Sequence, residues 1–217
     1  MTARRSLRFT RRRASSGPVR KRDNRASSAA PVVPCHTRIR MAEDMSVRHS
    51  DLALVVARID VDGAPHWLLR RHPKWGDWSL VGGHVEPDEV LDWMLTAVRE
   101  SNEEMAPLRC GVDIEVEPLL DDITSWGPVA SRSAHGAMTN YRVRWFQVRF
   151  LRDVAECLGR LPHADFALVP ETELSSNSLV SSVAQRLLEE THRRTTTLPL
   201  AGHFEARAVP LRIAAPS

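Results

Sequence analysis

Two adjacent glycines, Gly82 and Gly83, stand at the end of a short apolar segment and directly before a stretch rich in acids. Residues 88–105 contain neither proline nor glycine, and Pro107 follows shortly afterwards, so we predict a helix that ends before this proline. Glycine permits backbone conformations and close approaches that other residues exclude. This order of strand, glycine pair, acids and helix constrains the local structure more than any other part of the sequence.

The predicted helix carries three glutamates, Glu100, Glu103 and Glu104, separated by three and four positions. This spacing places their side chains on one helix face, where three carboxylates repel one another unless a cation lies among them. Hard cations such as Mg²⁺ prefer oxygen ligands and keep waters or substrate phosphates in their remaining positions. A lone helix of this kind is more often a solvated surface, but combined with the glycine pair it predicts a divalent-cation site.

These residues resemble the Nudix box, in which a glycine and a glutamate precede an Arg-Glu pair and a Glu-Glu pair. The matching residues are Gly83, Glu89, Arg99-Glu100 and Glu103-Glu104, and the lead-in from Trp78 to Pro87 is similar to that of the family. The chain departs from the box because nine residues, 90–98, separate Glu89 from Arg99 where the family has seven. Ser101 also stands at an apolar position, and Ala106 replaces the closing glycine.

The resemblance implies that Mg²⁺ (or Mn²⁺) is bound by Glu100, Glu103, Glu104 and the carbonyl of Gly82. Glu100 is also the expected catalytic residue, as the base or as the group that positions a metal-bound water. Some family members take the base from a later loop, for which Asp121, Asp122 and Glu156 are the candidates here.

Structural support of the box is expected from Gly83, Glu89 and Arg99. By resemblance, Glu89 braces the loop through Arg99, but the two-residue insertion leaves open whether this role is altered or passes to Asp88. The insertion lies between loop and helix and preserves the spacing of the glutamates within the helix.

The implied function is metal-dependent hydrolysis of a nucleoside diphosphate linked to another moiety, with water attacking phosphorus. A catalytically inactive Nudix-fold domain that binds a nucleotide or regulates a partner is the first alternative. Nucleic-acid binding through a basic N-terminal arm is the second. The expected partner is therefore a nucleoside diphosphate derivative, and a homodimer stays open.

The remaining pattern predicts an α/β fold, with a mixed sheet flanked by helices, as in the α/β/α sandwich of the Nudix family. A helix over 88–105 should bury Leu91, Met94, Leu95, Val98 and Met105. A long polar loop is expected around 121–140. Strands are expected over 52–59, 66–71, 78–81, 112–123, 141–151 and 167–169, and a second amphipathic helix over 178–194.

Composition, apolar periodicity and the resemblance predict three parts: a disordered basic extension (1–48), a Nudix hydrolase domain (49–195) and a tail (196–217). Residues 1–40 hold 12 of the 30 basic residues and one of the 27 acidic ones, which leaves 18 basic against 26 acidic residues in the remainder. We therefore do not expect the folded part to bind nucleic acid. The extension is typical of a nucleic-acid arm, of a transit peptide or of an unselected, mis-started segment.

Two further features limit the location and suggest pocket residues. No apolar run approaches the roughly 18 residues of a membrane span, and three widely spaced cysteines favour a reducing compartment, the cytoplasm. Trp75 and Trp78 lie close to the box, where each either lines the pocket or anchors a loop.

Overall fold

The structure is a computed structural model that describes residues 47–193 and 197–205. The predicted extension over 1–48 lies outside these residues except for its last two positions, and so does most of the predicted tail. No helix within the described ranges is long and apolar enough to cross a membrane.

The central strand, β1 (Arg48–Val61), contains the apolar run that predicted a buried strand. It pairs in parallel with β7 (Met138–Phe150) and antiparallel with β2 (Ala64–Arg71) and β4 (Val81–His84). The predicted hairpin between β1 and β2 is confirmed, and Asp62 (φ 51°) and Gly63 (φ 84°) form its turn. Two successive positive φ values match the twist of antiparallel strands.

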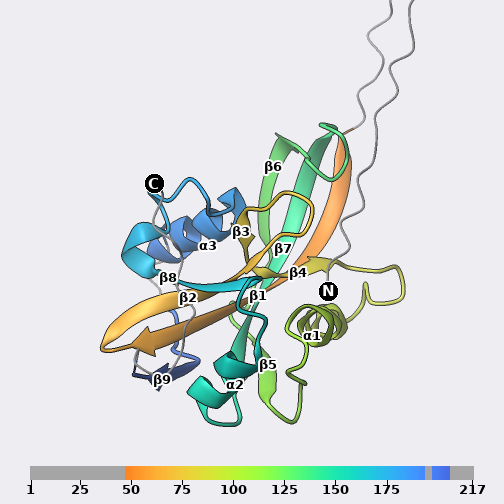
Figure 1. The fold of residues 1–217 in the computed structure, drawn as a ribbon. Coiled ribbons are helices and arrows are strands. Elements are labelled where there is room, and N and C mark those ends of the chain that lie inside the picture. Colours follow the sequence, from red (N-terminus) through yellow and green to blue (C-terminus); the bar gives the residue numbers. More distant parts are fainter. Residues whose placement is uncertain (1–46, 194–196, 206–217) are drawn as a thin grey trace, which may run out of the picture. The chain divides into compact units, whose positions relative to one another are not determined.

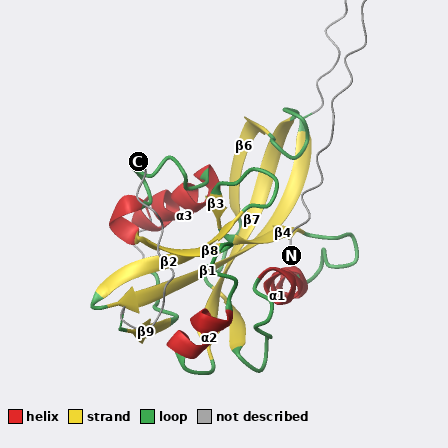
Figure 2. Cartoon of the chain, in the orientation of Figure 1, coloured by secondary structure: helices red, strands yellow, loops and turns green. Residues whose placement is uncertain are grey.

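Within the described residues, nine strands form one mixed sheet, which confirms the predicted α/β class. Its main path runs β3-β2-β1-β7-β5, with β4 and β9 also paired to β1, β6 to β7 and β8 to β2. Figure 1 shows the helices on the two sides of this sheet. In Figure 2 the long strands lie at the centre of the fold, between the helices. The strands not yet located are β3 (Trp78–Ser79), β5 (Ile114–Pro118), β6 (Thr124–Ala130), β8 (Phe166–Pro170) and β9 (Gly202–Phe204).

Each face of the sheet is covered by helices because successive residues of β1 point to opposite sides. Val55, Ala57 and Ile59 face α1 (Trp93–Glu104) and α2 (Val154–Arg160). Leu54 and Val56 face α3 (Ser182–Arg193) instead. Both sets are buried, so the continuous apolar run is explained by a strand that has no solvent-facing side.

The prediction of which residues form the buried face of the box helix is partly wrong. The helix begins at Trp93, not Asp88, and its buried residues are Trp93, Thr96, Ala97 and Ser101. Leu91 precedes the helix and is 97% exposed, and Leu95 is 53% exposed. Of the nine residues between Glu89 and Arg99, residues 90–92 precede the helix, so its buried face starts from Trp93 rather than from Leu91.

Two other segments differ from the sequence prediction. The polar loop expected around 121–140 contains β6, which pairs antiparallel with β7. Gly127 and Pro128 lie at an irregularity of this pairing, between Trp126 and Val129. The predicted tail contributes β9, whose residues pair in parallel with β1 at Ile59–Val61.

Candidate active site

Both glycines of the pair lie within β4 and pair with β1, Gly82 opposite Leu54 and Gly83 opposite Ala53. Gly82 has a φ of 132°, and a Cβ there would collide with the carbonyl of Ala53. A Cβ on Gly83 would collide with the carboxylate of Glu100. Glycine is therefore required twice, once for close packing of the strand and once to admit the glutamate.

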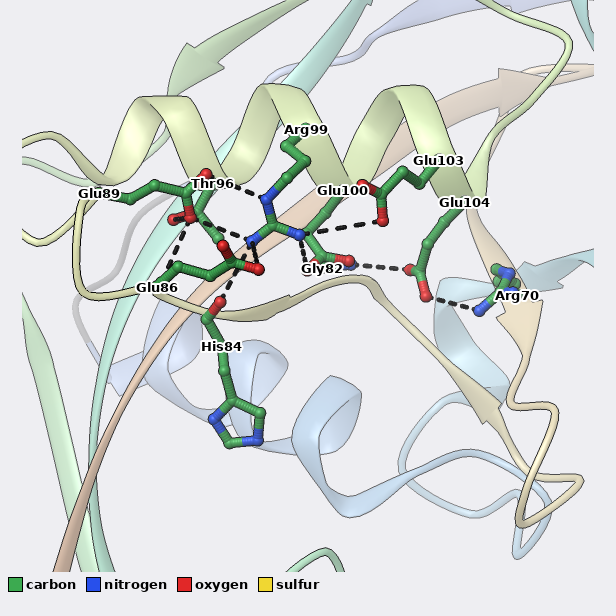
Figure 3. Close-up of polar contacts among 10 residues, drawn as sticks. All are labelled: Arg70, Gly82, His84, Glu86, Glu89, Thr96, Arg99, Glu100, Glu103 and Glu104. Atoms are coloured by element: carbon green, nitrogen blue, oxygen red, sulfur yellow. Dashed lines mark hydrogen bonds and ion pairs between the residues drawn. The ribbon is translucent and has the colours of Figure 1, made fainter.

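Arg99 connects the loop after β4 to the helix. Its Nε and Nη2 atoms donate to the two carboxylate oxygens of Glu89, each at 3.0 Å, and its Nη1 donates to Glu100 Oε1 at 2.7 Å. Nη2 also donates to the carbonyl of His84 at 3.3 Å. Figure 3 shows the guanidinium surrounded by these acceptors, with Glu86 and Glu103 farther away at 3.8 and 3.9 Å.

Glu89 itself holds Arg99, and the role does not pass to Asp88, which lies exposed in the turn. Thr96 Oγ1 donates to Glu89 Oε2 at 2.7 Å, and the Glu86 N–H donates to the same oxygen at 3.3 Å. The Arg99 hydrogen bond is the main cause that lowers the pKa of Glu89 to about 2. The contact between Glu89 and Arg99 is therefore present despite the insertion.

The three glutamates do not have equal surroundings. Glu104 Oε1 accepts from Arg70 Nη1 at 2.6 Å, and Glu104 Oε2 accepts from the Gly82 N–H at 3.0 Å. Burial raises the pKa of Glu104, although the bond from Gly82 and the charge of Arg70 oppose this effect. Glu103 points to solvent, with 61% of its side chain exposed, against 14% for Glu100 and 21% for Glu104.

The donor set fits a hard divalent cation in its chemistry, because it consists of carboxylate oxygens beside a glycine strand. The space left by the missing Cβ of Gly83, which the Glu100 carboxylate uses, supports the same fit. In the described part of the chain, however, no three acidic, histidine or cysteine side chains gather closely enough to enclose a metal. Arg99 forms an ion pair with Glu100, and Arg70 forms one with Glu104. A cation would therefore compete with these two ion pairs.

The glutamates border a cavity of about 940 Å³, within the range of small-molecule sites. Gly82, Gly83, Arg99, Glu100 and Glu104 line it, but Glu103, Asp121, Asp122 and Glu156 do not. Glu156 belongs to α2, which packs on the opposite face of the sheet from α3.

The other walls of this cavity come from residues that the sequence did not single out as site residues. The β2–β3 loop provides His72 and Trp75, the segment after β6 provides Arg132, and α3 provides Gln185 and Arg186. Only the position of Trp75 near the box indicated such a role. The others could not be found because the pairing of β6 and the position of α3 bring them to the site.

Comparison with known proteins gives a family and a set of similar structures. Residues 49–194 match the family model described as NUDIX domain. No curated protein sequence matches the chain significantly.

Three solved structures illustrate the likeness, all of low sequence identity. Ap4A hydrolase of C. elegans is 18% identical, with 67% of this chain and 98% of that chain covered and a TM-score of 0.47. The NUDIX domain of Shewanella oneidensis NrtR, solved with ADP ribose, is 17% identical, with 68% and 89% covered and a TM-score of 0.44. A NUDIX hydrolase from Nitrosomonas europaea is 17% identical, with 70% and 93% covered and a TM-score of 0.43.

Proposed function

Because this chain belongs to the Nudix family, we propose that it is a divalent-metal-dependent diphosphohydrolase. Its substrate would be a nucleoside diphosphate linked to another moiety, and its products a nucleoside monophosphate and a phosphorylated remainder. The observation that carries the proposal is the position of Glu100 against Gly83, at the wall of the cavity and in contact with Arg99. A helix whose acids were only solvated would need neither the glycine nor the arginine.

Glu100, Glu103, Glu104 and the carbonyl of Gly82 would hold Mg²⁺ or Mn²⁺. This cation would neutralise phosphate charge, polarise phosphorus and lower the pKa of a bound water. Glu103, although exposed, lies 3.9 Å from Arg99, and its side chain is free of the strand packing that restrains Glu100 and Glu104.

The chain's own residues then orient the reacting groups. Glu100 accepts the proton of the attacking water, which keeps the nucleophile close to hydroxide. Arg99 fixes the direction of this carboxylate through its 2.7 Å bond, and Glu89 in turn fixes Arg99 with two bonds of 3.0 Å. Arg70, which contacts Glu104 in the same cavity, is placed to meet the negative charge of the diphosphate.

A panel of nucleoside diphosphate derivatives, assayed with Mg²⁺ and Mn²⁺, tests the proposal. We expect turnover of at least one compound, and we expect this turnover to be lost when the metal is chelated. Glu103→Gln and Glu104→Gln should each abolish turnover while the circular dichroism spectrum stays unchanged.

Glu173→Gln is the matched control, because Glu173 lies in the short 3₁₀ segment after β8 and does not line the cavity. Turnover that survives Glu103→Gln and Glu104→Gln would contradict the proposed metal site. No turnover across the whole panel, combined with retained nucleotide binding, would instead favour a non-catalytic ligand-binding domain.

A further inference from the structure

Three side chains that line the cavity are stacked on one another. The rings of His72 and Trp75 have centroids 3.9 Å apart and an interplanar angle of 19°. The guanidinium carbon of Arg132 lies 4.4 Å from the centroid of the Trp75 ring. The indole therefore stacks on an imidazole and contacts a guanidinium, and the Lys74 Nζ lies farther away, 5.7 Å from the centroid of the Trp75 ring.

The loop that carries Trp75 is held in shape by its own hydrogen bonds. The His72 N–H donates to the carbonyl of Asp77 at 2.7 Å, and the Gly76 N–H donates to the carbonyl of His72 at 2.8 Å. The Lys74 N–H donates to His72 Nδ1 at 3.2 Å, which orients the imidazole. Burial lowers the pKa of His72, so a neutral ring supports the indole at neutral pH.

Arg132 is held less firmly than the ring that it covers. Its side chain is 56% exposed, and its other contact is an ion pair with Asp77 at 2.6 Å. An exposed cation–π contact changes an equilibrium constant by about two- to fivefold. Stacking of a nucleobase on an aromatic side chain is worth about fivefold to more than a hundredfold. A base can therefore replace the guanidinium on Trp75.

The stacked residues also follow closely in sequence after Arg70, which contacts one of the three glutamates. Arg70 binds Glu104 at the end of β2, and His72 follows two residues later, about 7 Å along an extended backbone. Glu104, Arg70, His72 and Trp75 all line the same cavity. One ligand can thus place charged groups at the glutamates and a flat ring at the tryptophan.

We propose that Trp75 is the nucleobase-stacking residue of this chain and that Arg132 covers the ring surface on which the base stacks. The inference rests on the proposed function for the identity of the ligand, a nucleotide. Trp75 would then be the residue that distinguishes a nucleotide from a sugar phosphate. Binding of the base requires Arg132 to move away from the Trp75 ring.

Equilibrium binding by calorimetry tests this without hydrolysis. The probes are AMP and ribose 5-phosphate, which share a sugar and a phosphate and differ in the base. Trp75→Ala should weaken AMP binding by about fivefold to a hundredfold and leave ribose 5-phosphate binding unchanged. An equal effect on both probes, or no effect on AMP, would overturn the proposal.

Two conservative variants separate stacking from loss of structure. Trp75→Phe keeps an aromatic ring and should retain most of the AMP affinity. Trp78→Phe is the matched control, because Trp78 is three positions away but packs with the core beneath α3 and does not line the cavity. Weakening of AMP by Trp78→Phe as large as that by Trp75→Ala would point to disturbed packing and would count against stacking.

Arg132→Ala tests the second part of the proposal. Removing the competing cation should strengthen AMP binding by about two- to fivefold, whereas weaker AMP binding would show that Arg132 serves the ligand directly. These measurements are independent of turnover. A chain that fails to hydrolyse any compound but discriminates AMP from ribose 5-phosphate through Trp75 would refute the proposed catalysis and retain this site.

Discussion

At the scale of single residues, Arg99 carries the largest share of the site's organisation. Its guanidinium bonds to both oxygens of Glu89 and to Glu100, so one side chain joins the loop to the proposed base. Glu89 is the more deeply enclosed of the two acids, with 11% of its side chain exposed. The ion pair should therefore contribute to folding as well as to the direction of Glu100.

Glu89→Gln should lower the free energy of unfolding at pH 7 by about 1.5–3 kcal/mol, because hydrogen bonds to charged groups are lost. The pKa of Glu89 is lowered to about 2 from an ordinary value of 4.5, so its charge stabilises the fold above pH 4.5. This contribution is lost as the pH falls through about 2. Urea unfolding of both proteins at pH 7, 4 and 3 should show the difference shrinking; a constant difference would contradict the ion pair as its cause.

Gly83 leads to a second prediction at this scale. A Cβ there would collide with the Glu100 carboxylate, so Gly83→Ala should displace Glu100 and lower kcat by about 10²-fold. Gly159→Ala is the control, since a Cβ at Gly159 meets nothing within 4 Å. If both variants retain full turnover, the contact between Gly83 and Glu100 is not part of the catalytic geometry.

The sequence was sufficient to predict the residues of the box but not their different surroundings. Spacing alone placed Glu100, Glu103 and Glu104 on one face, and the structure separates them by exposure. The reason is that Arg70 of β2 and Gly82 of β4 both donate hydrogen bonds to Glu104. The pairing of β2 and of β4 with β1, which brings these two residues to the helix, is not visible in the motif.

At the scale of elements, the box helix starts where Asp92 caps it. The Asp92 side chain accepts a hydrogen bond from the Met94 N–H at 3.0 Å, and two turns, closed by Glu89 N–H to Glu86 O and Asp92 N–H to Glu89 O, precede the helix. Asp92→Ala should cost about 1 kcal/mol of stability, measured by chemical denaturation. Asp88→Ala, in the exposed turn, is the matched control and should leave stability unchanged; equal losses would show that the cap does not fix the helix start.

Strands with continuous apolar runs were predictable, and strands interrupted by turn-forming residues were not. Residues 52–59 indicated β1 because both faces of that strand are buried. By contrast, Gly127 and Pro128 concealed β6, since the irregularity that accommodates them depends on the partner strand. The helix start was missed for a related reason: Leu91 fits an apolar spacing but belongs to a turn.

At the scale of the whole molecule, the described residues that line the cavity lie between Leu52 and Glu189. A chain that begins at Met45 should therefore keep the full kcat/KM, which a steady-state assay of both proteins would check. If the basic segment 1–40 binds nucleic acid, only the longer chain should show binding that weakens steeply with salt. Loss of turnover in the shorter chain would mean that the first residues contribute to the site.

The position of β1 predicts which backbone amide hydrogens exchange slowly with solvent. Because β1 pairs with four other strands and is buried on both faces, its amide hydrogens should exchange with solvent only when the whole domain unfolds. Gly83 pairs with Ala53 of β1 and shares this protection, whereas residues 72–77 lie in a surface loop and should exchange through local fluctuations. A bound nucleotide should therefore slow deuterium uptake in that loop, while the exchange rate of Gly83 stays unchanged.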